Sequence, residues 1–148
     1  MIIQIIGLPG SGKTFLAKAL KERINAIHLN ADEVRATVNS DLGFTKEDRI
    51  EQARRMGEMA RLIANQGVAP VIVDFVCPTK ETREAFGKPD ILVYMYTIQQ
   101  GRFEDTNKMF KSHQNMTLDS QVIYLILIKK HQQLSISLVS TTGLPQQH

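Results

Sequence analysis

Residues 7–14 read GLPGSGKT and carry the side chains best suited to chemistry in this sequence. They fit G-x-x-x-x-G-K-[ST], in which glycines let backbone N–H groups surround an anion. A lysine at this place can contact the β- and γ-phosphates of a nucleotide, and the next hydroxyl can bind Mg²⁺. We therefore predict an ATP site with Mg²⁺, formed by Gly7, Gly10, Ser11, Gly12, Lys13 and Thr14. The alternative is a glycine turn that matches the pattern by chance.

Two aspartates follow apolar segments and are candidates for the same site. Asp74 closes VIVD, which is typical of a Walker-B carboxylate, and we predict that Thr14 and Asp74 bind the metal. Asp32 follows LNA and could accept a proton from a substrate hydroxyl, or hold Mg²⁺ through water. We predict Lys13 and Asp32 as the catalytic residues. The alternatives are a helix N-cap for Asp32 and a strand-end turn residue for Asp74.

A single aromatic residue, Phe44, lies in the otherwise polar or glycine-containing segment NSDLGFTKEDR. It is either a platform for a flat ring or a plug that closes the edge of the sheet. Three further arginines, Arg54, Arg55 and Arg61, follow in a predicted helix. We interpret these three as charges on the helix surface.

The elements that must position these residues alternate between strands and helices. Apolar runs predict strands at 2–6, 26–29, 70–75 and 91–96, and helical spacing predicts helices from residue 13 and at 32–38, 46–66 and 79–86. Thr45 is the expected N-cap of the third helix, and Gly67 is expected to end it. This alternation predicts an α/β fold of the P-loop NTPase type, with a parallel sheet and helices on both faces.

The end of the sequence differs from the rest. From residue 111 the charged residues are Lys111, Asp119, Lys129 and Lys130, and Gln, Ser and Thr are frequent. LSISLV alternates like a strand, whereas VIYLILI supports no assignment. We predict a P-loop kinase domain at 1–110 and an atypical tail at 111–148, within that domain or appended to it.

Composition and charge limit the partners. The 148 residues carry a formal net charge of +3 without a block of basic residues, which suits an anionic small molecule and argues against nucleic acid. The longest apolar run, 122–128, is far shorter than the roughly 20 residues of a membrane span. A single cysteine, Cys77, excludes an internal disulfide. With no signal peptide at the start, we expect a cytoplasmic protein and no membrane partner.

Residues 29–61, LNADEVRATVNSDLGFTKEDRIEQARRMGEMAR, resemble the adenylylsulfate kinases. The family pattern is D-x-x-R, then L-N-x-x-L-G-F-[ST]-x-x-D-R, then a basic helix ending in E-[VM]-A. With the P-loop, the resemblance covers about residues 1–87. It implies transfer of the γ-phosphate of ATP to the 3′-hydroxyl of adenosine 5′-phosphosulfate, a step of sulfate activation.

The resemblance also implies roles for residues of the acceptor site. Asp32 would be the base or metal-site carboxylate, Arg35 and Arg49 would hold the phosphosulfate, and Phe44 would stack on the adenine. Gln52 stands where the family usually has Asn, and Val76 belongs to a loop expected to line the acceptor pocket. In that loop Cys77 replaces the usual Ser. The acceptor-binding prediction is therefore Asp32, Arg35, Phe44, Arg49, Gln52 and Val76.

After Thr97 the sequence departs from the family, which normally continues into a long basic lid. Here it reads IQQGRFEDTNKMFKSHQN, and an open nucleotide site is the expected result. Two alternatives follow: a P-loop kinase for another small nucleotide-like acceptor, or a nucleotide-binding module with little turnover. We also predict that two copies of the chain form a homodimer.

Overall fold

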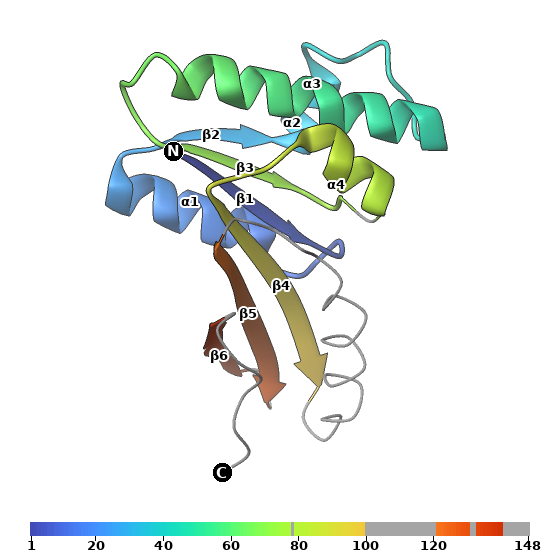
Figure 1. The fold of residues 1–148 in the computed structure, drawn as a ribbon. Coiled ribbons are helices and arrows are strands. Elements are labelled where there is room, and N and C mark those ends of the chain that lie inside the picture. The colour runs from blue at the N-terminus through green and yellow to red at the C-terminus, as the bar shows by residue number, and fades with distance from the viewer. Residues whose placement is uncertain (78, 100–120, 131–132, 141–148) are drawn as a thin grey trace.

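A computed structural model describes residues 1–77, 79–99, 121–130 and 133–140. Strands and helices alternate through the first hundred residues, and two further strands follow (Figure 1). The strands are β1 (Ile2–Gly7), β2 (Ile27–Asn30), β3 (Val71–Phe75), β4 (Ile91–Gln99), β5 (Gln121–Lys130) and β6 (Gln133–Ser140). The helices are α1 (Lys13–Ile24), α2 (Ala31–Ala36), α3 (Lys46–Ala64) and α4 (Lys80–Phe86). In these residues no helix is long and apolar enough to cross a membrane.

The strands form one sheet in the order β2-β3-β1-β4-β5-β6. All neighbouring pairs from β2 to β5 are parallel, and β6 runs antiparallel to β5. The predicted parallel sheet is therefore confirmed, as is the strand predicted for LSISLV, which lies in β6. β5, formed by the apolar run that supported no assignment, and the antiparallel direction of β6 were not predicted.

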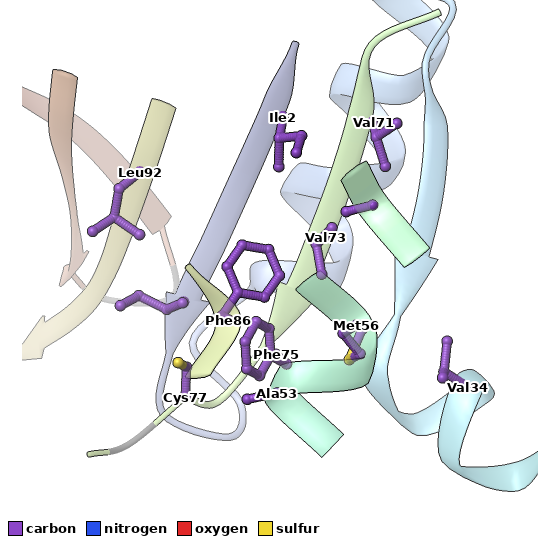
Figure 2. Packing of buried hydrophobic residues seen from close by; sticks show 12 residues of the cluster. Ile2, Val34, Ala53, Met56, Val71, Val73, Phe75, Cys77, Phe86 and Leu92 are labelled. Atoms are coloured by element: carbon purple, nitrogen blue, oxygen red, sulfur yellow. The ribbon is translucent and has the colours of Figure 1, made fainter. Parts of the chain in front are cut away.

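β1 is buried along its whole length because helices cover both faces of the sheet. Ile3 and Ile5 pack with Ala17 of α1 on one face. Ile2 and Ile6 belong to a second cluster on the other face, where α3 and α4 lie. Figure 2 shows this second cluster, in which Phe86 of α4 lies beside Phe75 at the end of β3. The prediction of helices on both faces is confirmed.

Local chemistry explains where the helices begin and end. Thr45 caps α3, as predicted, by accepting a hydrogen bond from the N–H of Asp48 at 3.1 Å. α3 ends at Ala64, slightly earlier than expected, and Gly67 follows with a φ of 70°. α3 and α4 touch at Gly57, where an added Cβ would lie 2.2 Å from the carbonyl oxygen of Phe86. Only glycine permits so close an approach.

This arrangement brings the carboxyl ends of β1, β2 and β3 together. The P-loop follows β1, α2 follows β2, and the segment 76–79 follows β3. Ligands of open α/β sheets bind at this edge. The fold therefore places the predicted chemistry of three distant segments at one place.

Candidate active site

One cavity of about 430 Å³ lies at this edge of the sheet. Residues of all three carboxyl-end segments line it, together with the segment that carries Phe44. The lining residues are Pro9, Gly10, Lys13, Thr14, Asn30, Ala31, Asp32, Arg35, Phe44, Arg49, Gln52, Asp74, Phe75, Val76, Cys77 and Thr82. The structure thus brings together every predicted acceptor-site and metal-site residue. Of the predicted ATP-site residues, Gly7, Ser11 and Gly12 do not line this cavity.

The P-loop presents a helix N-terminus to the cavity. Gly10 and Gly12 have φ values of 77° and 91°, a conformation that favours glycine, and α1 begins immediately afterwards without a side-chain cap. The first N–H groups of α1 therefore remain available to an anion, which the helix dipole also attracts. The loop therefore has the geometry of a phosphate cradle, and its binding of a nucleotide stays a prediction.

Lys13 is a buried cation inside that cradle. Its Nζ donates to the carbonyl oxygen of Leu8 at 3.0 Å. Burial lowers the pKa of Lys13, and the nearby Asp74 and Asp32 act in the opposite direction. A phosphate bound beside Lys13 would restore the lost solvation of the ammonium group, so this lysine favours an anion as its neighbour.

Asp74 is held at the bottom of the cavity by three side chains. Thr14 Oγ1 donates to Asp74 Oδ1 at 3.3 Å, and Asn30 Nδ2 donates to the same oxygen at 3.0 Å. His28 Nε2 contacts the other oxygen, Oδ2. Asp74 lies inside β3 and is 2% exposed, so the alternative of a strand-end turn residue is wrong.

The oxygen atoms of Thr14 and Asp74 fit Mg²⁺ chemically. Mg²⁺ prefers oxygen ligands, and in kinases it is held by one or two protein groups together with water and substrate phosphates. In the part of the chain that the structure describes, no group of three or more His, Cys, Asp or Glu residues forms a metal site. A hydroxyl and one carboxylate beside a phosphate cradle therefore match a metal that arrives with the nucleotide.

Asp32 lies in the first turn of α2 and its carboxylate is exposed to the cavity. The N-cap of α2 is Asn30, whose Oδ1 accepts a hydrogen bond from the N–H of Glu33 at 3.0 Å. The alternative of Asp32 as an N-cap is therefore wrong. The side chain of Asp32 makes no hydrogen bond with the residues that the structure describes, and its carboxylate remains available to a substrate.

Phe44 is 69% exposed and lines the cavity, which excludes a role as a plug. The guanidinium carbon of Arg35 lies 4.5 Å from the centroid of its ring. Arg35 also donates to the carbonyl oxygen of Gly43, and Asp48 Oδ2 accepts from the N–H of Gly43 at 2.9 Å. Arg49 Nε donates to the carbonyl oxygen of Phe44 at 3.0 Å. Side chains of α2 and of the first turn of α3 thus hold the loop between these helices at two successive residues, Gly43 and Phe44.

Two residues of the cavity lining, Gln52 and Cys77, are buried and hold neighbouring segments together. Gln52 is 2% exposed, and its amide accepts from Asn39 at 2.8 Å and donates to the carbonyl oxygen of Ala31 at 3.2 Å. Its contact with an acceptor stays a prediction. Cys77 is buried against Gln4 and Thr82, and burial raises the pKa of its thiol to about 12. Such a thiol is unreactive at neutral pH.

The arginines of α3 beyond Arg49 point to other partners. Arg54 pairs with Glu51 at 2.7 Å, and Arg55 pairs with Asp41 at 2.8 Å. Arg61 donates to the carbonyl oxygen of Phe86 at 2.7 Å and joins α3 to α4. None of the three lines the cavity. Arg54 is an exposed charge on the helix surface, as interpreted, whereas Arg55 and Arg61 are half-buried.

Sequence analysis missed His28 and Asn30. They lie two residues apart on β2 and therefore point to the same face, and Asn30 pairs in register with Asp74. A histidine and an asparagine at i and i+2 at the end of a strand were the available signal. The lid prediction and the domain boundary at residues 110 and 111 lie outside the described residues, which omit 100–120.

Comparisons with known proteins point in one direction. The family model described as Adenylylsulphate kinase matches residues 1–116. An adenylyl-sulfate kinase of Bacillus licheniformis is 45% identical over 87 residues, which are 55% of this chain and 44% of that protein. One of Geotalea daltonii is 39% identical over 89 residues, 57% of this chain and 43% of that protein. The chain thus spans less than half the length of these relatives.

A solved structure supports the same relationship. The structure of the Mycobacterium tuberculosis APS kinase CysC in complex with AMPPNP and APS is similar with a TM-score of 0.56 and 28% identity. The similarity covers 76% of this chain and 69% of that one. The predicted P-loop fold is confirmed by this match together with the sheet order described above.

Proposed function

Because this chain belongs to the adenylylsulfate kinase family, we propose that it transfers the γ-phosphate of ATP to the 3′-hydroxyl of adenosine 5′-phosphosulfate. One observation carries the proposal. The exposed carboxylate of Asp32 lines the same cavity as the phosphate cradle of Lys13 and Thr14 and the exposed ring of Phe44. Donor, base and acceptor platform are thus available to one pair of substrates.

The donor side is suited to the triphosphate. The N–H groups at the start of α1 and the ammonium group of Lys13 would bind the β- and γ-phosphates. Thr14 and Asp74 would hold Mg²⁺, which when bound neutralises charge on these phosphates. Lys13 needs little rearrangement for this role, because among the described residues its Nζ donates a hydrogen bond to the carbonyl oxygen of Leu8 alone.

The acceptor side is suited to a planar base with a compact anion. The ring of Phe44 would stack on the adenine, while the guanidinium groups of Arg35 and Arg49 would bind the phosphosulfate. Arg49 uses Nε for the carbonyl oxygen of Phe44, and its two terminal nitrogens make no hydrogen bond with the residues that the structure describes. That free end matches two anionic oxygens. Gln52 and Val76 complete the proposed acceptor site.

Asp32 would act on the hydroxyl that lies between the two sides. Its carboxylate would accept the proton of the 3′-hydroxyl, or orient this hydroxyl for in-line attack on the γ-phosphorus. The attacking oxygen forms the new P–O bond as the bond to the β-phosphate oxygen breaks, and ADP leaves. Lys13 would stabilise the charge on the transferred group throughout.

We also propose a domain organisation, a cellular location and an oligomeric state. The kinase domain would occupy residues 1–110, with the tail contributing β5 and β6 to the same sheet. The protein would act in the cytoplasm, without nucleic-acid or membrane partners. Two copies would form a homodimer.

The test is turnover by the purified chain with Mg·ATP and adenosine 5′-phosphosulfate. We expect a 3′-phosphorylated product with wild type and none above background with Lys13→Ala. Lys18→Ala is the matched control, since Lys18 is an exposed lysine of the same helix, and it should retain activity. ATP binding without any product would instead favour a nucleotide-binding module, and product only from another nucleotide-like acceptor would favour a different kinase specificity.

A further inference from the structure

His28 contacts the proposed metal carboxylate from outside the cavity. It lies on β2 with its side chain 9% exposed, and Asp74, on the neighbouring strand β3, is 2% exposed. His28 Nε2 reaches Asp74 Oδ2, whereas the cavity lining includes Asp74 but not His28. His28 therefore acts on any ligand in the cavity through Asp74.

The two oxygens of Asp74 have different partners. Oδ1 accepts from Thr14 at 3.3 Å and from Asn30 at 3.0 Å, so it faces the phosphate cradle. Oδ2 faces His28 on the other side. An ionised carboxylate only accepts hydrogen bonds, so toward ionised Asp74 the Nε2 of His28 would be the donor of this contact. With a donor on each oxygen, rotation of the carboxylate would break at least one bond.

We infer that His28 is a positioning residue that holds Asp74 with Oδ1 toward Thr14, ready for the metal that accompanies the nucleotide. The inference rests on the Mg·ATP site of the proposed function. Partners of this kind fix the orientation of a ligand carboxylate, and their loss typically lowers metal affinity or activity by about 10- to 100-fold. Without His28, Oδ2 would be a buried oxygen without a donor, and the carboxylate would turn toward other partners.

The test measures how much Mg²⁺ strengthens ATP binding. ATP is titrated calorimetrically into the full chain, once with EDTA and once with saturating Mg²⁺, for wild type, His28→Leu and His28→Gln. We expect the gain in affinity caused by Mg²⁺ to fall at least tenfold in His28→Leu, with the same affinity in EDTA. In His28→Gln the side-chain amide nitrogen lies near the place of Nε2, and the gain should stay within about threefold of wild type.

A merely structural role would give a different result, because a general loosening of the site would weaken ATP binding in EDTA as well. The inference is overturned if His28→Leu keeps the full Mg²⁺ gain, or if His28→Gln loses as much of it as His28→Leu. If His28→Leu does not fold, His28→Asn provides the same comparison, since its amide is polar but too short to reach Oδ2.

These outcomes separate the inference from the proposed reaction. A wild-type protein that shows the Mg²⁺ gain and the predicted variant pattern, but makes no product from adenosine 5′-phosphosulfate, contradicts the proposed acceptor and leaves the role of His28 standing. A wild-type protein whose ATP affinity does not respond to Mg²⁺ overturns both.

Discussion

The two ends of the cavity are built in different ways. The proposed phosphate end consists of residues from the sheet and the P-loop. Side-chain hydrogen bonds join Thr14, Asn30 and Asp74 to each other, and Lys13 beside them donates to the carbonyl oxygen of Leu8. Of these, Lys13, Asn30 and Asp74 are buried. At the proposed acceptor end, the ring and the guanidinium groups expected to bind the base and the anion belong to Arg35, Phe44 and Arg49, none of which is buried, whereas Gln52 behind them is buried. At this end Arg35 donates a hydrogen bond to the carbonyl oxygen of Gly43, and Arg49 donates one to that of Phe44.

This difference in burial and hydrogen bonding fits the groups that each end is proposed to bind, phosphates at one and a base with an anion at the other. Charged groups that leave water need fixed partners, and an arrangement with all partners satisfied is rigid. An exposed ring and two exposed or half-buried guanidinium groups need no such network, and main-chain bonds to one loop suffice to place them. We therefore expect substitutions at the phosphate end and at Asp32 to abolish chemistry, and substitutions at the acceptor end to weaken binding.

The largest effect should come from Asp32→Asn. Asn cannot take up the hydroxyl proton, and general base catalysis typically contributes about 10²- to 10⁴-fold to a rate. We expect kcat for the phosphorylation of adenosine 5′-phosphosulfate to fall within that range, while binding of both substrates changes little. Steady-state kinetics and calorimetric titrations would separate the two effects.

Glu33→Gln is the matched control for this variant. Glu33 follows Asp32 in the same helix turn, is exposed and does not line the cavity, so the same loss of charge should leave kcat unchanged. If Asp32→Asn retained wild-type kcat, Asp32 would not act on the hydroxyl and the mechanism would need another base.

The next largest effect should come from Arg49→Ala at the acceptor end. A hydrogen bond to a charged group contributes roughly 1.5–3 kcal/mol, which corresponds to about a 10- to 150-fold change in affinity. The dissociation constant of adenosine 5′-phosphosulfate should rise by that factor, whereas that of ATP should not change. Arg54→Ala is the control, because Arg54 lies on the same helix and pairs with Glu51 outside the cavity. Equal losses in both variants would show that overall charge, not the placed guanidinium, attracts the acceptor.

Phe44→Ala should have a smaller effect in the same assay. Stacking of a base on an aromatic ring contributes roughly 1–3 kcal/mol, and we expect the lower part of that range because the ring is exposed. Affinity for adenosine 5′-phosphosulfate should fall by about 5- to 30-fold, with ATP affinity unchanged. Phe44→Tyr, which keeps a stacking face, should behave like wild type. Phe15→Ala is the control, since Phe15 is 81% exposed on α1. If Phe44→Ala lost more affinity for ATP than for adenosine 5′-phosphosulfate, Phe44 would contact ATP and the proposed acceptor role would be wrong.

Local patterns predicted the strand, loop and helix around residues 7–14 correctly, because this motif is continuous in the sequence. The glycines, Lys13 and Thr14 lie close together in the sequence, an apolar run precedes them, and a segment with apolar residues at helical spacing follows them. Two of the three side-chain partners of Asp74, His28 and Asn30, could not be found in this way. His28 and Asn30 contact it only because β2 and β3 are neighbours in a particular register, and that register is a property of the whole sheet.

Local sequence patterns also fail to decide where some helices begin and whether some apolar segments form strands. Asn30 and Asp32 are both common N-cap residues two positions apart, and only the observed start of α2 shows that Asn30 is the cap. The segment that forms β5 has no alternation, which suits a strand or a buried helix equally. Its place beside β4 depends on a partner thirty residues away in the chain.

The smallest effect concerns Cys77, which lies in the cavity wall and is 3% exposed. Burial raises the pKa of its thiol from 9.0 to about 12, so the folded protein resists formation of the thiolate. The stability linked to this group is therefore complete below about pH 9 and decreases as the pH rises from there toward 12. In this range the free energy of unfolding should decrease with pH at a slope that approaches about 1.4 kcal/mol per pH unit.

We expect this slope to appear as a difference between wild type and Cys77→Ser, measured as free energies of unfolding by urea between pH 8 and pH 11. Serine keeps the size and the hydrogen-bonding ability of the side chain but does not titrate in this range, and the other groups that titrate are common to both proteins. The wild-type value should therefore fall relative to that of Cys77→Ser only above about pH 9. Parallel curves would mean that the thiol reaches solvent in the native state. The wall behind the acceptor would then be open, and the rigid part of the cavity would be confined to the phosphate end.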